Sequence, residues 1–197
     1  MKSVIACLAG ALFLACALLA HADDDKAKKD NETNLLVNGS FEEGPDPGEQ
    51  GFVSLDKDSK EIKGWVVTRA QIDYVGTYWQ HADGNRSIDL HGSPGYGGIK
   101  QTFKTKKGQK YRVSFALAAN PEGAVAEKKI GVKAAGKEEK FTFDGTGKTK
   151  EDMGWSTQVW DFEATGDETT LEFYTLMEED PNCGPVLDNV SVVPVKE

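Results

Sequence analysis

Apolar and polar residues alternate with a period of two along most of this chain, as in β-strands that bury one face. In YRVSFALA, at residues 111–118, one face carries Tyr111, Val113, Phe115 and Leu117. Similar alternation is found in KIGVKA (129–134), KFTF (140–143), WDFEA (160–164), TLEFYTL (170–176) and VSVV (190–193). Glycine, proline and charged residues separate these segments, and no long window keeps the apolar stripe of a helix. The pattern predicts an all-β protein, which we interpret as a single jelly-roll β-sandwich.

The N-terminal residues predict an exported protein. Residues 1–22 carry one lysine, an apolar run and the small-residue sequence AHA before an aspartate cluster, which indicates a secretory signal peptide. Residues 23–33, DDDKAKKDNET, contain no apolar residue larger than alanine and predict a disordered lead-in. One domain is expected over 34–197, with a long polar loop at 44–61. No second apolar segment follows the first, so no membrane span is expected.

Charge and cysteine content narrow the classes of partner. Removal of 1–22 takes away one lysine and no acid, so the formal charge changes from −9 to −10. An acidic exported chain is a poor candidate for binding nucleic acid or an anionic membrane. Cys183 is the one cysteine outside the signal peptide, so no intramolecular disulfide is expected. A disulfide-linked dimer stays open if Cys183 is exposed.

Several motifs together carry a family resemblance: NLLVNGSFEEGP (34–45), IKGW (62–65), IDYVGTYWQHADGNRSIDLHG (72–92), YGGIKQTF (96–103), GQKYRVSFALAANPEG (108–123), MGW (153–155) and GPVLDNVSVVPV (184–195). Over residues 34–193 the chain resembles the bacterial branch of the "domain of unknown function 642" family, often described as choice-of-anchor C proteins. The resemblance implies a galactose-binding-domain-like jelly roll. Plant members of that family are cell-wall proteins associated with polysaccharide binding and wall-modifying enzymes. Bacterial relatives often carry an anchoring segment after the domain, whereas this chain stops at Glu197, which favours a secreted or periplasmic protein.

Three carboxylates form a candidate metal site. In a jelly roll the first and last strands commonly lie side by side, which would bring Glu42 near Asp188. Similar sugar-binding jelly rolls hold a structural calcium there, and Asp83 is a candidate third ligand. Calcium needs roughly six to eight oxygen ligands, which carboxylates and loop carbonyls supply. In the alternative interpretation, Glu42 and Asp188 bond backbone amides and no metal binds.

The segment 74–103 supplies the candidate ligand-binding residues. Ile88 and Leu90 are expected to point inward, which leaves Ser87, Asp89 and His91 outward. Large rings beside glycine-rich turns suit the apolar face of a sugar, while polar side chains suit its hydroxyls. The candidates are Tyr78, Trp79, His81, Arg86, His91 and Tyr96. Trp79 has a strong alternative as a buried plug at one end of the barrel.

The sequence therefore predicts a secreted, non-enzymatic carbohydrate-binding module for extracellular or cell-wall polysaccharide. An extracellular protein-interaction or matrix domain is the alternative. A groove on the outer sheet face, lined by Arg112, Glu172 and Tyr174, is a less favoured binding site than the loops. Alternating polar residues ordinarily form the solvent-exposed face of a strand. Glycan hydrolysis is the least favoured function, because no acid lies in an evidently apolar setting that would raise its pKa.

Overall fold

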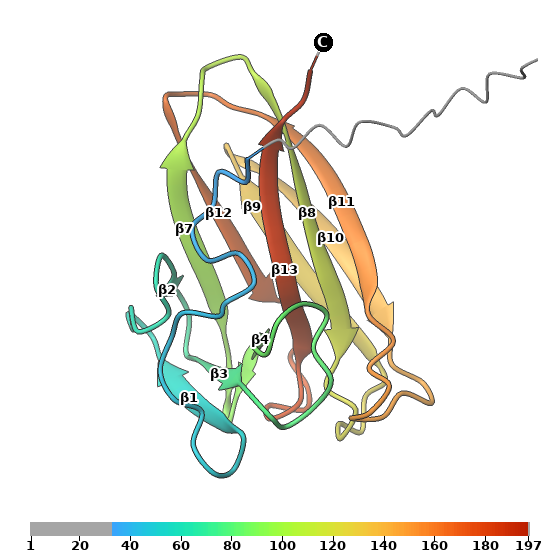
Figure 1. The fold of residues 1–197 in the computed structure, drawn as a ribbon. Helices are drawn as coiled ribbons and strands as arrows, with labels where there is room; N and C mark the ends of the chain where they lie inside the picture. The colour runs from blue at the N-terminus through green and yellow to red at the C-terminus, as the bar shows by residue number, and fades with distance from the viewer. Residues whose placement is uncertain (1–32, 197) are drawn as a thin grey trace, which may run out of the picture. The chain divides into compact units, whose positions relative to one another are not determined.

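The computed structural model describes residues 33–196, which form antiparallel strands and no helix (Figure 1). A six-stranded sheet has the order β1 (Phe52–Asp56), β3 (Gln71–Val75), β4 (Ser87–Asp89), β13 (Pro185–Pro194), β8 (Lys110–Ala119) and β11 (Ser156–Glu163). A five-stranded sheet has the order β10 (Lys137–Asp144), β9 (Glu127–Ala134), β12 (Glu168–Thr175), β7 (Gly98–Lys104) and β2 (Val66–Val67). A short hairpin joins β5 (His91–Gly92) to β6 (Gly95–Tyr96). The all-β jelly-roll sandwich predicted from the sequence is confirmed.

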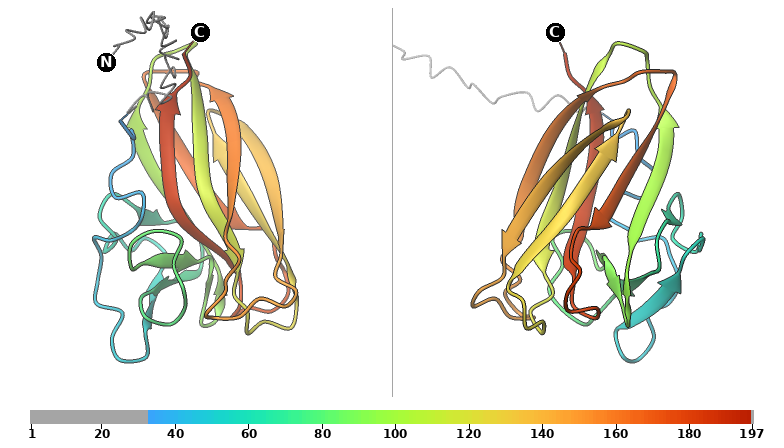
Figure 2. Two further views of the ribbon diagram at one scale, coloured as in Figure 1. Left: turned by 45° about the vertical axis from the view of Figure 1, so that its right-hand side comes forward. Right: turned by 180° about the vertical axis from the view of Figure 1, so that it is seen from behind.

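The core lies between the two sheets, which Figure 2 shows from two sides. Phe115 on β8 meets Phe141 on β10 and Phe173 on β12, with ring centroids 5.2 and 5.0 Å apart. These edge-to-face contacts connect the sheets directly. The alternation read from 111–118 thus produces the packing, because the odd-numbered side chains of β8 all enter this core.

The segment that precedes β1 follows β13 without forming a strand. The Leu35 amide donates to the Val192 carbonyl at 2.9 Å, and the Val190 amide donates to the Gly39 carbonyl at 2.8 Å. A side chain at Gly39 would lie 2.0 Å from the Val190 oxygen, so this close approach requires glycine. The two ends of the domain are therefore paired through irregular backbone, and Glu42 and Asp188 lie at one edge of that pairing.

The structure corrects one sequence prediction and leaves two others wholly or largely outside the described residues. The continuous polar loop expected at 44–61 is wrong in its second half, because Leu55 is buried and β1 pairs with β3 there. The predicted signal peptide and residues 23–32 of the lead-in lie outside the described residues. Within 33–196, no helix is long and apolar enough to cross a membrane.

Candidate functional site

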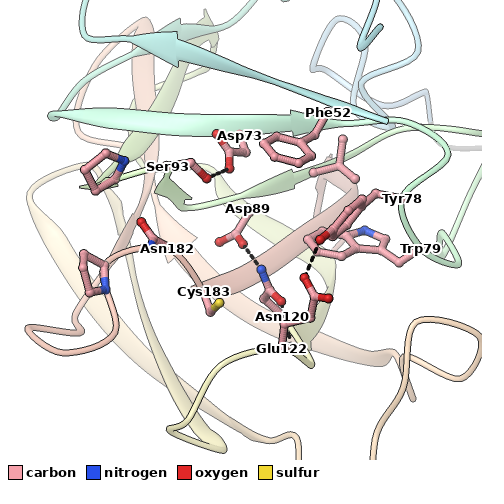
Figure 3. Close-up of a pocket in the computed structure, with 13 residues that line it drawn as sticks. Phe52, Asp73, Tyr78, Trp79, Asp89, Ser93, Asn120, Glu122, Asn182 and Cys183 are labelled. Atoms are coloured by element: carbon pink, nitrogen blue, oxygen red, sulfur yellow. Dashed lines mark hydrogen bonds between the residues drawn. The ribbon is translucent and has the colours of Figure 1, made fainter. Parts of the chain in front are cut away.

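A cavity of ≈ 520 Å³ opens at the end of the sandwich where β8 ends and β13 begins (Figure 3). Strands β1, β3 and β4 supply one side of it, and the loops at 120–122 and 181–183 supply the other. The lining residues are Phe52, Asp73, Val75, Tyr78, Trp79, Asp89, Ser93, Pro94, Asn120, Glu122, Pro181, Asn182 and Cys183. Residues far apart in the sequence thus combine apolar rings with carboxyl and amide groups. We call this cavity the end pocket.

Three aromatic rings form one wall of the end pocket. The Tyr78 ring lies edge-on to Phe52 and to Trp79, with centroids 5.2 and 5.6 Å apart. Trp79 is 6% exposed and its indole N–H donates to the Ser87 hydroxyl at 2.9 Å, so it mainly supports the wall. Phe52 and Tyr78 are half-buried and present ring surface to the pocket.

The Tyr78 ring is also held from the solvent side. The Tyr78 hydroxyl donates to Glu122, and the Lys150 ammonium lies 3.6 Å from the centroid of the Tyr78 ring. Lys150 also pairs with the other oxygen of Glu122 at 2.7 Å. Hydrogen bonding to the Glu122 carboxylate raises the pKa of Tyr78. These contacts join three loops at the pocket mouth and restrict the Tyr78 ring to one orientation.

Two buried carboxyl groups lie deeper in the end pocket. Asp73 on β3 accepts hydrogen bonds from the hydroxyls of Ser54 at 2.6 Å and Ser93 at 2.7 Å, and burial raises its pKa. Asp89 on β4 is 1% exposed. Its oxygens accept bonds from the amides of His91 (2.9 Å) and Gly184 (3.0 Å) and from Asn120 Nδ2 (2.9 Å). Asp89 thus connects β4 to both loops that close the pocket.

Burial raises the pKa of Asp89 to about 8, although three N–H donors favour its ionised form. The expectation that no acid lies in such a setting is therefore wrong. As the alternation predicts, Asp89 and Ile88 lie on opposite faces of β4. The 181–184 segment covers the face that carries Asp89. Ser87, Asp89 and His91 are therefore buried. This differs from the prediction that they point outward.

We expect the protein to lose stability as the pH rises from about 6.5 to about 8.5. A carboxyl whose pKa is raised on folding stabilises at low pH, and this contribution disappears as the pH rises through its folded pKa. Asp89, near 8, and Asp188, near 7, act in this direction. His91, whose pKa burial lowers to about 4, acts oppositely, but only below its ordinary value of 6.5. The loss should be roughly 2 kcal/mol, or a Tm decrease of about 5 °C.

Thermal unfolding in a buffer series checks this result. Asp89→Asn should reduce the dependence of Tm on pH, whatever it does to the absolute Tm, because it removes one of the two titrating carboxyl groups and leaves Asp188. A Tm that is constant or increases across this interval would contradict the assignment.

His91 and Tyr96, two of the predicted ligand residues, hold a wall of the pocket from behind. Both ring nitrogens of the buried His91 are bonded, Nδ1 to the Asp180 carbonyl and Nε2 to the Thr175 hydroxyl, each at 2.8 Å. The Tyr96 hydroxyl donates to the Glu178 carbonyl at 2.9 Å, and its ring lies edge-on to His91. The structure thus uses both residues to position the 178–183 segment, and neither lines the end pocket.

His81 and Arg86 also lie outside the end pocket. His81 bonds the Ser87 hydroxyl at 3.3 Å and the Gly76 carbonyl. Arg86 donates to the Asn85 carbonyl at 2.8 Å, and its guanidinium lies 6.0 Å from the Tyr74 ring centroid. Of the six predicted ligand residues, the pocket brings together Tyr78 and Trp79 and leaves the other four elsewhere.

The candidate calcium ligands meet around the 82–85 loop. Asp188 Oδ2 accepts the amides of Ala82 at 2.8 Å and Asp83 at 2.9 Å, and Glu42 Oε1 accepts the Asn85 amide at 2.8 Å. The loop therefore presents N–H donors to these carboxylates, whereas calcium requires oxygen ligands. Within 33–196, no group of three or more His, Cys, Asp or Glu side chains is placed to hold a metal. The carboxylates of Glu42 and Asp188 thus bond backbone amides, as in the alternative interpretation, and the calcium site stays a prediction.

Sequence reasoning missed several pocket residues, because each appeared to belong to an ordinary strand or turn: Phe52, Asp73, Asn120, Glu122 and Cys183. The ANPEG turn at 119–123 was one available signal, since it follows the longest alternating segment directly. The Cys183 thiol is half-buried in the pocket, and burial raises its pKa to about 11. A thiol in that state is a weak nucleophile at neutral pH.

Comparison with known proteins places the chain in a family. The model described as "Protein of unknown function (DUF642)" matches residues 34–193. The chain belongs to the DUF642 family. Halomucin of Haloquadratum walsbyi is 32% identical over 168 residues, which is 82% of this chain and 2% of that protein. An Arabidopsis thaliana protein, "DUF642 L-galactono-1,4-lactone-responsive gene 2", is 26% identical over 92% of this chain and 47% of its own length. The chain therefore spans half or less of these curated relatives.

Two solved structures are similar to this chain at low sequence identity, and the first of them shares its fold. The arabinose-bound α-L-arabinofuranosidase MgGH51 aligns with a TM-score of 0.51 and 12% identity, over 83% of this chain and 26% of that chain. TmCBM61 in complex with β-1,4-galactotriose aligns with a TM-score of 0.47 and 14% identity, over 83% and 99%. These matches concern the β-sandwich. Membership of the bacterial branch and of the galactose-binding-like class stays a prediction.

Proposed function

We propose that this DUF642 chain is a secreted or periplasmic carbohydrate-binding module that holds a sugar residue of an extracellular polysaccharide in the end pocket. The observation that carries the proposal is the combination of half-buried ring surface with hydrogen-bond acceptors in one cavity of ≈ 520 Å³. A sugar ring has apolar C–H faces and peripheral hydroxyls, so it needs both kinds of surface. Tyr78 and Phe52 provide the first kind, and Asp73 and Glu122 provide the second.

The pocket chemistry supports binding over hydrolysis. A glycosidase needs one carboxylic acid near the leaving oxygen and a second carboxylate within reach of the sugar. Asp89 has the raised pKa of a catalytic acid, but two backbone amides and the Asn120 side chain already occupy three of its about four acceptor sites, and it is 1% exposed. It therefore acts as a structural connector in the described chain. We expect no release of reducing ends from any polysaccharide that the protein binds.

The test is binding of the purified protein to cellulose, pectin, xylan, chitin and acidic exopolysaccharides, with calcium and with a chelator. Saturable binding to one class is the expected result. A chelator-dependent decrease in affinity would support calcium, and unchanged affinity would agree with the amide-bonded carboxylates. A folded protein that binds no member of the panel would overturn the proposal in favour of an extracellular protein partner.

A further inference from the structure

The part of the chain that the structure describes lines the end pocket with carboxyl groups and with no basic side chain. Three of its thirteen lining residues in the described chain are acids, namely Asp73, Asp89 and Glu122, and none is Lys, Arg or His. Figure 3 shows the three carboxyl groups on different walls of the same space. A ligand in this pocket therefore meets acceptors from several directions.

Among the three acids, Glu122 alone has a basic partner within residues 33–196, and that partner lies outside the lining. Lys150 pairs with Glu122 at 2.7 Å. Asp73 is bonded by two serine hydroxyls, which carry no charge. Asp89 is bonded by two backbone amides and the Asn120 side chain, which are also neutral. The negative charge that Asp73 carries when ionised thus has no neutralising basic partner among the described residues, whereas Asp89, with a pKa of about 8, is largely protonated at neutral pH.

Asp73 retains acceptor capacity for a ligand. A carboxylate offers about four lone-pair sites, and each oxygen of Asp73 uses one on a serine hydroxyl. A hydroxyl of the ligand can therefore donate to Asp73 directly. A carboxylate of the ligand has no proton to donate and would place a second negative charge beside the first, in a site where solvent screening is reduced.

Building on the proposed function, we propose that the end pocket selects sugar residues without a negative charge and excludes uronic acids. Asp73 accepts ligand hydroxyls in the interior, Glu122 accepts them at the mouth, and the Tyr78 ring packs against the sugar face. Selection then comes from the repulsion of acidic sugars as well as from attraction. The ligand class is a neutral polysaccharide.

The test compares polymers that differ at one group of each sugar residue, a charged carboxylate in one and a neutral hydroxymethyl group in the other. Each uronate polymer, such as polygalacturonate or alginate, is paired with its carboxyl-reduced form and titrated by calorimetry at low and high salt. We expect the reduced form of a bound backbone to bind at least about tenfold more tightly at low salt. The ratio of the two affinities, reduced form over acidic form, should fall toward one as the salt concentration approaches 1 M, where charges are screened over about 3 Å.

Asp73→Asn should lower this affinity ratio, because it removes a negative charge from the pocket. The hydroxyls of Ser54 and Ser93 can rotate to hydrogen-bond the new amide, so the fold should be retained. Glu168→Gln is the matched control, since it makes the same change of charge at an exposed residue paired with Lys104. Glu168→Gln should leave the affinity ratio unchanged. The comparison of the two variants therefore distinguishes the effect of a charge in the pocket from the effect of the net charge of the protein.

The outcomes distinguish this proposal from the proposed function. Equal binding of acidic and reduced polymers would overturn the exclusion of uronates while leaving the carbohydrate-binding function intact. An unchanged ratio in a folded Asp73→Asn variant would also overturn it. Tighter binding of the acidic form than of the reduced form would overturn it as well. No binding to any polymer, whether acidic, reduced or neutral, would overturn the proposed function itself.

Discussion

Replacing Lys128 with methionine is expected to lower the free energy of unfolding by about 3 kcal/mol, because it leaves a partly buried carboxylate without its buried partner. Lys128 lies on β9 with a side chain that is 0% exposed, and Asp180 is 16% exposed. The ammonium donates to Asp180 Oδ2 at 3.2 Å and to the Cys183 carbonyl at 2.5 Å. Methionine keeps the volume and removes both bonds, so the 180–183 wall of the end pocket loses its attachment to β9.

The expected Tm decrease is about 9 °C, measured by calorimetry or circular dichroism. Lys129→Met is a matched control, because the neighbouring lysine makes an exposed ion pair with Glu127 at 3.0 Å. That control should change stability by no more than about 0.5 kcal/mol. Equal effects of the two substitutions would show that the buried pair contributes nothing beyond an ordinary surface pair.

Replacing Tyr78 with alanine is expected to lower affinity for the bound polysaccharide by at least about tenfold, because the ring is the central aromatic surface of the pocket. Tyr78→Phe should retain most of the affinity, since it keeps the ring and removes only the hydroxyl bonded to Glu122. Titration against the polysaccharide identified in the panel measures both effects. Tyr78 is a better choice than Trp79, whose buried indole makes any substitution mainly a change of stability.

A matched control is Trp155→Ala, which removes a partly buried aromatic residue that lies outside the end pocket and donates to the Gln80 carbonyl. It should leave the affinity unchanged. If Tyr78→Ala binds as tightly as the unmodified protein, the sugar lies elsewhere. If Tyr78→Ala and Trp155→Ala lose affinity equally, the cause is general destabilisation and not loss of the ring.

Local alternation predicted the strands because a strand exposes its side chains to two faces in turn. The period of two in 111–118 located β8 and identified Phe115 as a core residue, and the same reading located β9, β10, β11, β12 and β13. The family followed from motifs spread over 34–193. These properties depend on neighbours along the chain or on whole motifs, so the sequence alone was sufficient to determine them.

The end pocket depended on tertiary structure. Alternation says which face of β4 carries Asp89, but only the loop that arrives from residues 181–184 decides that this face is covered. The same tertiary contacts make His91 bond the loop at Asp180, and they bring Asp73 and Glu122 into the lining of one cavity. Burial of a second sheet face is set by contacts between residues some tens to a hundred positions apart, and such contacts leave no periodic signal in the sequence.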